Sequence, residues 1–304
     1  MRTLTTLVIL YFFQLHAFSQ NIPDSSGMRN DSLSADVPIA DSVPTNVKIV
    51  DSLPKVAKIY KLRPGSDIPV TAIGTGWSLY AFTKIYSKER SPEEDILSLD
   101  VNDIPAFDRH GASVYHPEAD KVGDLMFYSA MPLPILLLFA NIVRKDAFKI
   151  AFLYLESMAV TGFFYTGSVY LADRYRPYAY NAEAPISERT RGGAKNSFFA
   201  GHVALVGTST FFIAKVLNDY HPHSKVKWLP FTLAGLATAT TGCMRYLGGQ
   251  HFLSDILLGT TLGTLSGILI PHIHKNKTAA DRFNFTAGYW GTTPQLGFTY
   301  KLMK

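Results

Sequence analysis

Five long apolar blocks dominate the second half of the chain. Each contains about 17 to 22 residues, which at a rise of 1.5 Å per residue matches the roughly 30 Å hydrocarbon core of a bilayer. A sixth block, residues 70–86, is shorter and contains Gly74, Gly76 and Lys84, so we expect it to be re-entrant or interfacial. The pattern predicts an all-α fold, an integral membrane helical bundle of five to six spans. The five predicted spans are residues 125–143, 150–171, 198–217, 228–244 and 252–273.

The first 68 residues show no such blocks beyond a short one at the start. Met1-Arg2, the apolar residues 4–13 and the small residues around Ser19 predict a signal peptide over residues 1–19, with a short uncleaved anchor as the alternative. An Asp-Ser pair then recurs every ten residues, at 31, 41 and 51. Repeats this short and polar cannot bury a core. We therefore predict a disordered low-complexity tether over residues 20–68, with a docking segment as the alternative.

The segments on either side of the apolar region have patterns of their own. Residues 69–122 are predicted to form re-entrant or interfacial helices, because apolar positions are scattered among polar ones beyond residue 91. In the tail, residues 276–304, large apolar residues alternate with others on both sides of Gly291 and Pro294. A period of two across a turn predicts a short C-terminal β-hairpin.

Charge distribution indicates which partners and which topology to expect. The net charge is +5, but Lys and Arg are scattered through short loops rather than clustered, which does not favour nucleic-acid binding. Basic residues at 144–149, 215–227 and 272–277 predict that these three loops face the cytoplasm. The other helix ends then open on the extracytoplasmic face. A translocated N-terminus together with a fully spanning 70–86 segment would invert every later helix.

Several isolated polar residues were interpreted without a motif. Cys243, the only cysteine, can form no intrachain disulfide and is predicted to be a small packing residue. Glu156 lies inside an apolar block, where it is expected to pair with a polar group on a neighbouring helix. Four histidines in basic loops are predicted to be solvated and not metal ligands: His221, His223, His272 and His274.

The most specific chemical pattern is Arg245, then His251 six residues later, then Asp255 four residues after that. Positions i and i+4 share a helix face, so the Asp255 carboxylate is expected to hold the His251 imidazole in one tautomer. The other ring nitrogen is then free to attack. The spacing predicts a nucleophile with its orienting group.

Two groups of residues upstream add donors. Arg174 and Arg176 precede Pro177 after one apolar block, and Gly201 and His202 open the next. Each group alone is weak, since an Arg-Pro pair can merely end a helix and a lone His at a helix start is commonly an interface residue. Together with the third pattern they predict a site for a tetrahedral oxyanion, above all phosphate.

These motifs, in this order, resemble those of the type 2 phosphatidic acid phosphatase and vanadium haloperoxidase superfamily. The family patterns K-x6-R-P, P-S-G-H and S-R-x5-H-x3-D correspond here to residues 169–177, 199–202 and 244–255. The resemblance covers roughly residues 120–273, and we assign residues 123–275 to a membrane phosphatase domain. The third motif carries most of the resemblance, because its spacing is improbable by chance.

The resemblance implies a reaction and a role for each residue. His251 would attack phosphorus to form a phosphohistidine, with Asp255 as its orienting partner. His202 would protonate the departing alkoxide and then activate water. No metal and no other cofactor are implied. The implied phosphate-binding residues are Arg176, Arg245 and Gly201, with Arg174 as a further candidate.

The chain departs from the family pattern at four positions. The motif lysine is replaced by Val169 and the motif serine before Gly-His by Ala200, so two expected phosphate donors are absent. The loss of one such donor can lower a rate by about 100-fold to 1000-fold. Arg174 or Lys195 could supply the missing charge. The other two departures are Phe199 and Met244.

Two classes of function remain open from the sequence. The first is a membrane-embedded, metal-independent phosphatase that hydrolyses a lipid phosphate monoester or diphosphate at the periplasmic face of a bacterial inner membrane. The second is a catalytically impaired relative that binds lipid phosphate or scaffolds an envelope complex. A phosphotransferase is hard to separate from the first class by sequence, and a soluble haloperoxidase is disfavoured by the apolar blocks. Substrate headgroup and oligomeric state are not readable.

Overall fold

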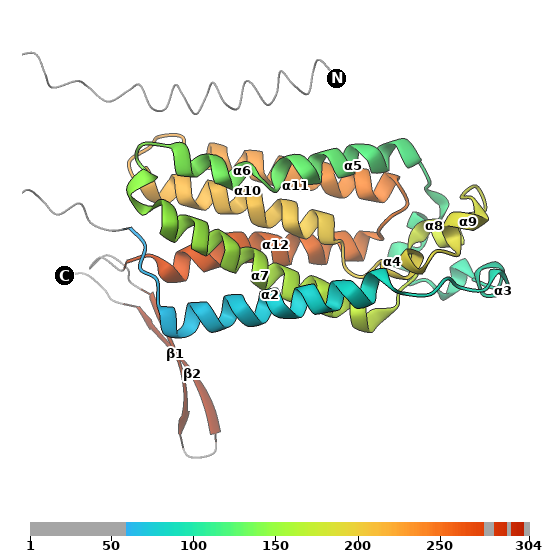
Figure 1. Cartoon of the computed structure of the whole chain (residues 1–304), viewed down its shortest axis with the longest axis horizontal. Helices are drawn as coiled ribbons and strands as arrows, with labels where there is room; N and C mark the ends of the chain where they lie inside the picture. Colours follow the sequence, from blue (N-terminus) through green and yellow to red (C-terminus); the bar gives the residue numbers. More distant parts are fainter. Residues whose placement is uncertain (1–58, 277–282, 291–292, 301–304) are drawn as a thin grey trace, which may run out of the picture. The chain divides into compact units, whose positions relative to one another are not determined.

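The structure is a computed structural model that describes residues 59–276, 283–290 and 293–300 (Figure 1). The predicted signal peptide, residues 1–19, and all of the predicted tether before residue 59 lie outside the described residues. Those two interpretations therefore stay predictions for residues 1–58. The tether was predicted to reach residue 68, but Tyr60 is buried and α2 begins at Pro64, so its last residues belong to the packed helical part.

Helices account for most of the described chain, and short ones connect the long ones. The long helices are α2 (Pro64–Tyr86), α5 (Pro117–Ala130), α7 (Ala147–Ala172), α10 (Gly201–Tyr220), α11 (Trp228–Leu247) and α12 (Leu253–His274). The short α-helices are α3 (Glu93–Leu97), α4 (Ala106–Arg109), α6 (Leu133–Leu136), α8 (Pro177–Tyr180) and α9 (Ile186–Arg189). The 3-10 turns are η1 (Val101–Asp103), η2 (His110–Ser113), η3 (Leu137–Phe139), η4 (Arg144–Asp146) and η5 (Gly192–Lys195).

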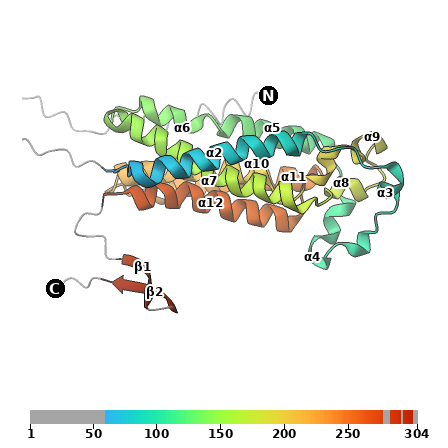
Figure 2. The ribbon, with the colours of Figure 1, turned by 60° about the horizontal axis from the view of Figure 1, so that its bottom comes forward.

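The long helices lie alongside one another, with α10 packed against α5, α7, α11 and α12, and α2 packed along α7 (Figures 1 and 2). The pairing of α10 with α12 is the most intimate, because glycines on α12 face the α10 backbone. A Cβ added at Gly263 would lie 2.1 Å from the carbonyl oxygen of Ala204, and one at Gly259 would lie 2.5 Å from that of Ala200. Small residues four apart let two helix backbones approach closely. This contact fixes the start of α10 beside the start of α12.

Three stretches are long and apolar enough to cross a membrane by length and composition, namely Pro117–Phe139, Arg144–Tyr180 and Leu253–His274. Each overlaps one of the five predicted spans. The helices α10 and α11, which cover the predicted spans 198–217 and 228–244, are not among them. The first stretch begins at 117 rather than 125, since α5 starts at Pro117, a residue that suits the first helical position.

Residues 70–86, expected to be re-entrant or interfacial, lie within α2, which is one continuous helix of 23 residues. The helix runs parallel to α7. Gly74 faces Ala159 near the middle of the pair, and Lys88, just beyond the end of α2, contacts Asp173, just beyond the end of α7. The beginnings of α2 and α7 therefore lie at the same end of the bundle.

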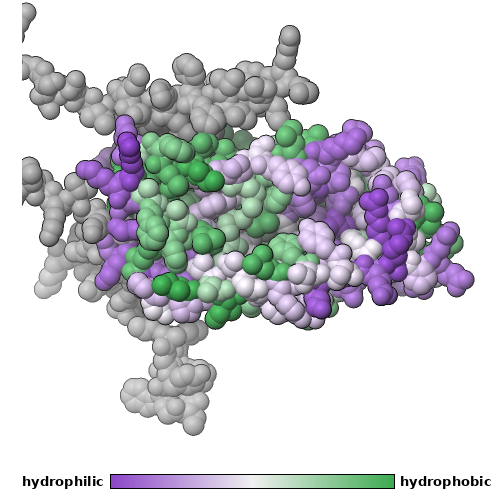
Figure 3. Space-filling view, viewed as in Figure 1, coloured by the Kyte–Doolittle hydropathy of each residue, from purple (hydrophilic) through white to green (hydrophobic). Residues whose placement is uncertain are grey.

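Apolar and polar side chains separate along the helices. On the face drawn in Figure 3, apolar side chains cover the helices, and polar side chains gather at the end that carries α8 and α9. The largest buried apolar cluster lies at the opposite end, and its members include Tyr60, Val143, Ile150, Phe212 and Val216.

Cys243, predicted to be a packing residue, is instead exposed on α11.

Two strands follow the helices. The strands β1 (Phe283–Trp290) and β2 (Thr293–Tyr300) pair antiparallel, with Phe283 opposite Tyr300 and Trp290 opposite Thr293. The residues between them, 291–292, lie outside the described part of the chain.

Candidate active site

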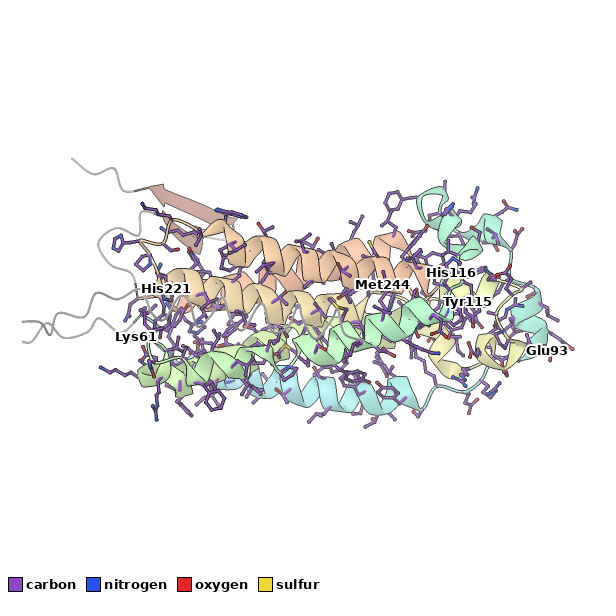
Figure 4. The ribbon with its side chains drawn as sticks, turned by 90° about the horizontal axis from the view of Figure 1, so that it is seen from above. Lys61, Glu93, Tyr115, His116, His221 and Met244 are labelled. Atoms are coloured by element: carbon purple, nitrogen blue, oxygen red, sulfur yellow. The ribbon has the colours of Figure 1, made fainter. Side chains whose placement is uncertain are left out.

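Three loops meet at the end of the bundle that carries α8 and α9. They join α7 to α8, η5 to α10, and α11 to α12. In Figure 4, Tyr115, His116 and Met244 lie at this end, whereas Lys61 and His221 lie at the other. Backbone hydrogen bonds tie the loops together, for example from the Ala200 N–H to the Asp255 carbonyl and from the Tyr178 N–H to the Gly249 carbonyl. Every residue predicted for the site lies at this end.

His251 is fully enclosed at the start of the α12 region, with 1% of its surface exposed. Its Nδ1 lies 2.7 Å from the carbonyl oxygen of Ser197. A carbonyl can only accept, so Nδ1 carries the hydrogen and Nε2 keeps its lone pair. The geometry therefore gives the imidazole the tautomer that a nucleophile requires.

The partner that fixes this tautomer is not the one predicted. His251 precedes α12, whose N-cap is Phe252, so His251 and Asp255 do not stack on one helix face. The Asp255 carboxylate accepts from the Ser197 hydroxyl at 2.6 Å and from the Phe252 N–H at 3.0 Å. Asp255 thus holds the Ser197 hydroxyl, and the Ser197 carbonyl in turn holds the His251 ring. The prediction of a direct Asp255–His251 contact was wrong, because the chain enters the helix only after the histidine.

Arg174, predicted as a phosphate ligand, is occupied by carboxylates. Its Nη1 lies 2.6 Å from Asp255 and its Nη2 lies 2.8 Å from Asp108, while its guanidinium stands 4.4 Å from the Phe252 ring centre. A guanidinium shared by two carboxylates has little charge left for a third anion. Arg174 is therefore better described as a positioning residue for Asp255.

Asp108 was not predicted from the sequence. It lies in α4 with 3% of its surface exposed and accepts hydrogen bonds from the backbone N–H and hydroxyl of Ser254 and from Arg174. Burial tends to raise the pKa of Asp108, but these hydrogen bonds outweigh it and hold that pKa below its usual value. Its sequence context, a scattered polar segment, carried no readable signal.

Arg176 fits its predicted position more closely. Its backbone N–H donates to the carbonyl of Ala194 at 2.7 Å and its Nε donates to that of Gly193 at 3.1 Å. One Nη donates to the side-chain oxygen of Gln250. Among residues 59–276 this guanidinium forms no ion pair with a carboxylate, so its charge is available to an incoming anion.

Arg245 is buried, with 2% of its surface exposed, and is held by two carboxylates of α5, Asp120 and Asp124. Gly123 allows this approach, since a Cβ there would lie 3.0 Å from the Arg245 Nε. That Nε has no hydrogen-bond partner among the described residues. Sequence reasoning missed both aspartates. Their spacing of four on one helix face is the signal that could have identified them.

His202 lies in the first turn of α10. Its Nε2 is 3.4 Å from an Asp124 carboxylate oxygen, and its ring packs against the Phe127 ring at 4.5 Å between centres. Asp124 therefore stands between His202 and Arg245. The carboxylate can accept from the imidazole and orient its ring for proton transfer.

Gly201 has a structural reason beyond phosphate approach. A Cβ at this position would lie 2.4 Å from the Tyr165 ring. Only glycine lets the start of α10 pass this close to α7. The predicted role in phosphate binding is untested, whereas the steric need is plain.

Among the described residues, no other donor takes the place of the motif lysine at Val169 or of the motif serine at Ala200. Val169 is buried beside Ala81 and Ile85, so a lysine there would place its ammonium among apolar side chains. Ala200 is fully buried at the N-cap of α10 and makes no side-chain cap. Lys88 does bring an ammonium to this helix end, but it binds the Val169 carbonyl and Asp173. Lys195, the other proposed substitute, is half-buried in η5.

The electrostatic setting favours a neutral nucleophile. Burial is the main cause that lowers the pKa of His251 well below its usual value, and the nearby charges of Arg176 and Arg245 add to it. His202 and Arg245 also share a contact with the Asp124 carboxylate. A neutral imidazole is the form of histidine that can attack a bound phosphoryl group.

Comparison with protein families agrees with this geometry. Residues 150–279 match the model of the PAP2 superfamily. The resemblance inferred from the three motifs, to the type 2 phosphatidic acid phosphatases, is thereby confirmed. The PAP2 match begins at residue 150 rather than near 120, so α5, with Asp120 and Asp124, lies outside it. No curated protein and no solved structure is significantly similar to the chain.

The PAP2 match bears on the activity at a coarse level. Superfamily members are phosphatases and hydrolases, which suggests phosphatase activity on phosphate esters. The three apolar stretches suggest a membrane protein.

Proposed function

We propose that the protein is a phosphatase that hydrolyses a lipid phosphate monoester or diphosphate through a phosphohistidine on His251. The observation that carries the proposal is the fixed tautomer of His251, a buried side chain whose Nδ1 is held by the Ser197 carbonyl. A lipid substrate suits a site at the end of apolar helices, because the acyl or prenyl chain can stay in the bilayer while the phosphate enters the loops.

Each step has a candidate group. Nε2 of His251 attacks phosphorus and the bond to the lipid oxygen breaks, while His202 delivers a proton to the departing alkoxide. Water, deprotonated by His202, then attacks phosphorus, which releases inorganic phosphate and restores the free imidazole. Arg176 binds the non-bridging oxygens, where charge develops in the transition state. Arg245 joins it when the phosphate displaces Asp120 or Asp124 from its guanidinium. Arg174 and Asp108 position Asp255 and do not touch the substrate.

The test is phosphate release from lipid phosphates by detergent-purified protein, with His251→Ala compared with His116→Ala. His116 is an exposed histidine at the same end of the bundle (Figure 4). We expect His251→Ala to lower the rate by at least about 1000-fold and His116→Ala to leave it unchanged. Equal rates in the parent and His251→Ala, with both well folded, would refute the nucleophile assignment.

We propose that the site faces the periplasm from the inner membrane, as the basic loops suggest. Because α2 and α7 are parallel, a membrane-spanning α2 would begin on the cytoplasmic face. Labelling of single cysteines in a Cys243→Ser background tests this. We expect Ser98→Cys to react with an impermeant reagent in whole spheroplasts, and Lys225→Cys to react only after lysis. The reverse pattern would place the site in the cytoplasm.

A second candidate, an impaired relative that binds lipid phosphate without turnover, is favoured by one specific observation. Both carboxylates on Arg245 stand where an anion would bind, and Val169 and Ala200 offer no donor. Binding of a lipid phosphate to the parent and to His251→Ala with equal affinity, and no phosphate release from either, would favour this candidate.

A further inference from the structure

A second cluster of ionisable side chains lies at the far end of α12 from the candidate active site. It contains Asp67 from α2, Glu156 from α7 and His274 from α12, all buried with 2%, 3% and 3% of their surfaces exposed. The 22 residues of α12 separate the two clusters by about 30 Å at 1.5 Å per residue. His274 was predicted to be solvated, which was wrong. Glu156, predicted to pair with a neighbouring helix, does lie near His274, at 3.7 Å.

The contacts within this cluster are incomplete. Nε2 of His274 lies 3.1 Å from an Asp67 oxygen and 3.7 Å from Glu156 Oε2. Glu156 Oε2 is buried and has no hydrogen-bond partner among the described residues. The hydroxyl of Thr71, one turn beyond Asp67 on α2, is likewise buried and unpartnered in the described part of the chain. Buried polar atoms normally have partners, so two unpartnered atoms together point to a missing one.

The His274 ring is oriented as in a metal-binding histidine. Its Nδ1 lies 2.7 Å from the carbonyl oxygen of Ile270, so Nδ1 carries a hydrogen and Nε2 faces both carboxylates. Metal-binding histidines commonly donate their second ring N–H to a carbonyl in this way. Nε2 and one oxygen from each carboxylate form a set of one nitrogen and two oxygens.

The spacing of the three groups suits a small divalent ion. The ligand atoms all lie within 4.8 Å of one another. An ion bound at about 2.0 to 2.2 Å from each ligand would place them roughly 3 to 3.5 Å apart, close to the 3.1 and 3.7 Å observed. Two buried carboxylates carry a charge that one divalent cation would neutralise.

We propose that Asp67, Glu156 and His274 bind one divalent transition-metal ion of the Zn²⁺ class, which joins α2 to α7 and α12. The chain before α2 already crosses this end of α12, since the Lys61 N–H donates to the His274 carbonyl and Tyr60 bridges to Lys275. An ion here would complete the attachment of α2. Its role is structural and independent of the proposed phosphatase reaction.

The test uses the full-length, detergent-purified protein after removal of any affinity tag and treatment with a chelator. Zn²⁺ is added and its binding is measured by calorimetry and elemental analysis, and Co²⁺ is added for its visible absorption. We expect one Zn²⁺ per chain, a higher unfolding temperature, and at least 10-fold weaker binding in Glu156→Gln, a nearly isosteric change that also alters the Co²⁺ spectrum.

Two controls separate this site from others. His272→Ala removes an exposed histidine near the same helix end and should leave Zn²⁺ binding intact, as should His251→Ala. His274→Ala should abolish binding, and Glu156→Gln gives the answer if that variant does not fold. Absence of stoichiometric binding in the parent, or equal loss in His272→Ala, would overturn the proposal. Neither result bears on phosphate release, so the two proposals fail separately.

Discussion

The two ends of α12 use similar side chains to different effect. At its start, the Asp255 carboxylate is fully buried and receives donors from Ser197, Phe252 and Arg174. At its end, Glu156 is equally buried beside His274, but one of its oxygens has no partner in the described chain.

This difference distinguishes a carboxylate that positions its neighbours from one that can bind a ligand. A carboxylate whose acceptor sites are all occupied cannot take up another group, so Asp255 can only hold its neighbours in place. A buried oxygen without a donor leaves a cost that a ligand can remove. The same contrast separates Arg174, which two carboxylates occupy, from Arg176, which forms no ion pair within the described residues.

The strongest test of this contrast is Asp255→Asn. The amide nitrogen would face donors, so we expect a loss of about 3 to 5 kcal/mol in the free energy of unfolding. Because Ser197 holds the His251 tautomer, the rate should fall by about 10-fold to 100-fold, rather than the roughly 10⁴-fold of a wrong tautomer. Thermal unfolding and phosphate release measure both effects. Asp103→Asn, an exposed aspartate at the same end, serves as the control, and a 10⁴-fold loss would restore the direct contact.

The next test concerns the packing of α10 against α12, which brings the starts of these two helices together at the candidate active site. Gly263→Ala places a methyl group 2.1 Å from the Ala204 carbonyl oxygen, so we expect a destabilisation of about 1 to 3 kcal/mol. Gly235→Ala on α11 has nothing within 4 Å and should stabilise by about 0.5 to 1 kcal/mol. Equal unfolding temperatures for the two variants would contradict the close approach of α10 and α12.

Sequence patterns predicted the parts of this molecule that depend on local spacing. The long helices, the three motifs and their meeting at one end follow from hydrophobic periodicity and from the family resemblance. The partners of the motif residues did not follow. Asp120 and Asp124 bind Arg245 from a helix more than a hundred residues earlier in the chain. Their spacing of four indicates a shared helix face, but it does not identify Arg245 as their partner.

His251 and His274 show the same limit in two ways. The spacing of His251 and Asp255 predicted a helical contact, but the helix begins between them. His274 lies among basic residues in the sequence, which suggested solvent, yet α2 and α7 cover it. Burial by a helix that is distant in the sequence depends on the tertiary structure, so a local sequence pattern does not predict it.

The lowered pKa of His251 predicts a pH dependence with a definite sign. In the folded state His251 stays neutral below its unfolded pKa of about 6.5, whereas in the unfolded state it binds a proton. Stability is therefore lost as the pH falls below about 6.5, by up to about 1.4 kcal/mol per pH unit. His251→Gln removes this contribution. Unfolding measured between pH 7.5 and 5 should show a shallower decline in the variant, and identical slopes would contradict a neutral buried imidazole.

A smaller effect is expected when one carboxylate is removed from Arg245. An incoming phosphate must compete with Asp120 for this guanidinium, so Asp120→Asn should strengthen inhibition by inorganic phosphate by about 3-fold to 10-fold. Glu118→Gln removes the same charge from the exposed part of α5, where Glu118 forms an ion pair with Lys121. If both variants shift inhibition equally, the effect is one of overall charge and not of Arg245.

The smallest expected change comes from restoring the motif hydroxyl with Ala200→Ser. Ala200 is the N-cap of α10 and makes no side-chain cap, and a serine there can accept from the first-turn N–H groups, which contributes about 0.5 to 2 kcal/mol. The same hydroxyl would stand beside the proposed phosphate position and raise turnover by up to about 10-fold. Ala204→Ser, one turn into the same helix and equally buried, adds a hydroxyl where no cap is needed. A gain in both variants would trace the effect to the hydroxyl and not to its place at the helix start.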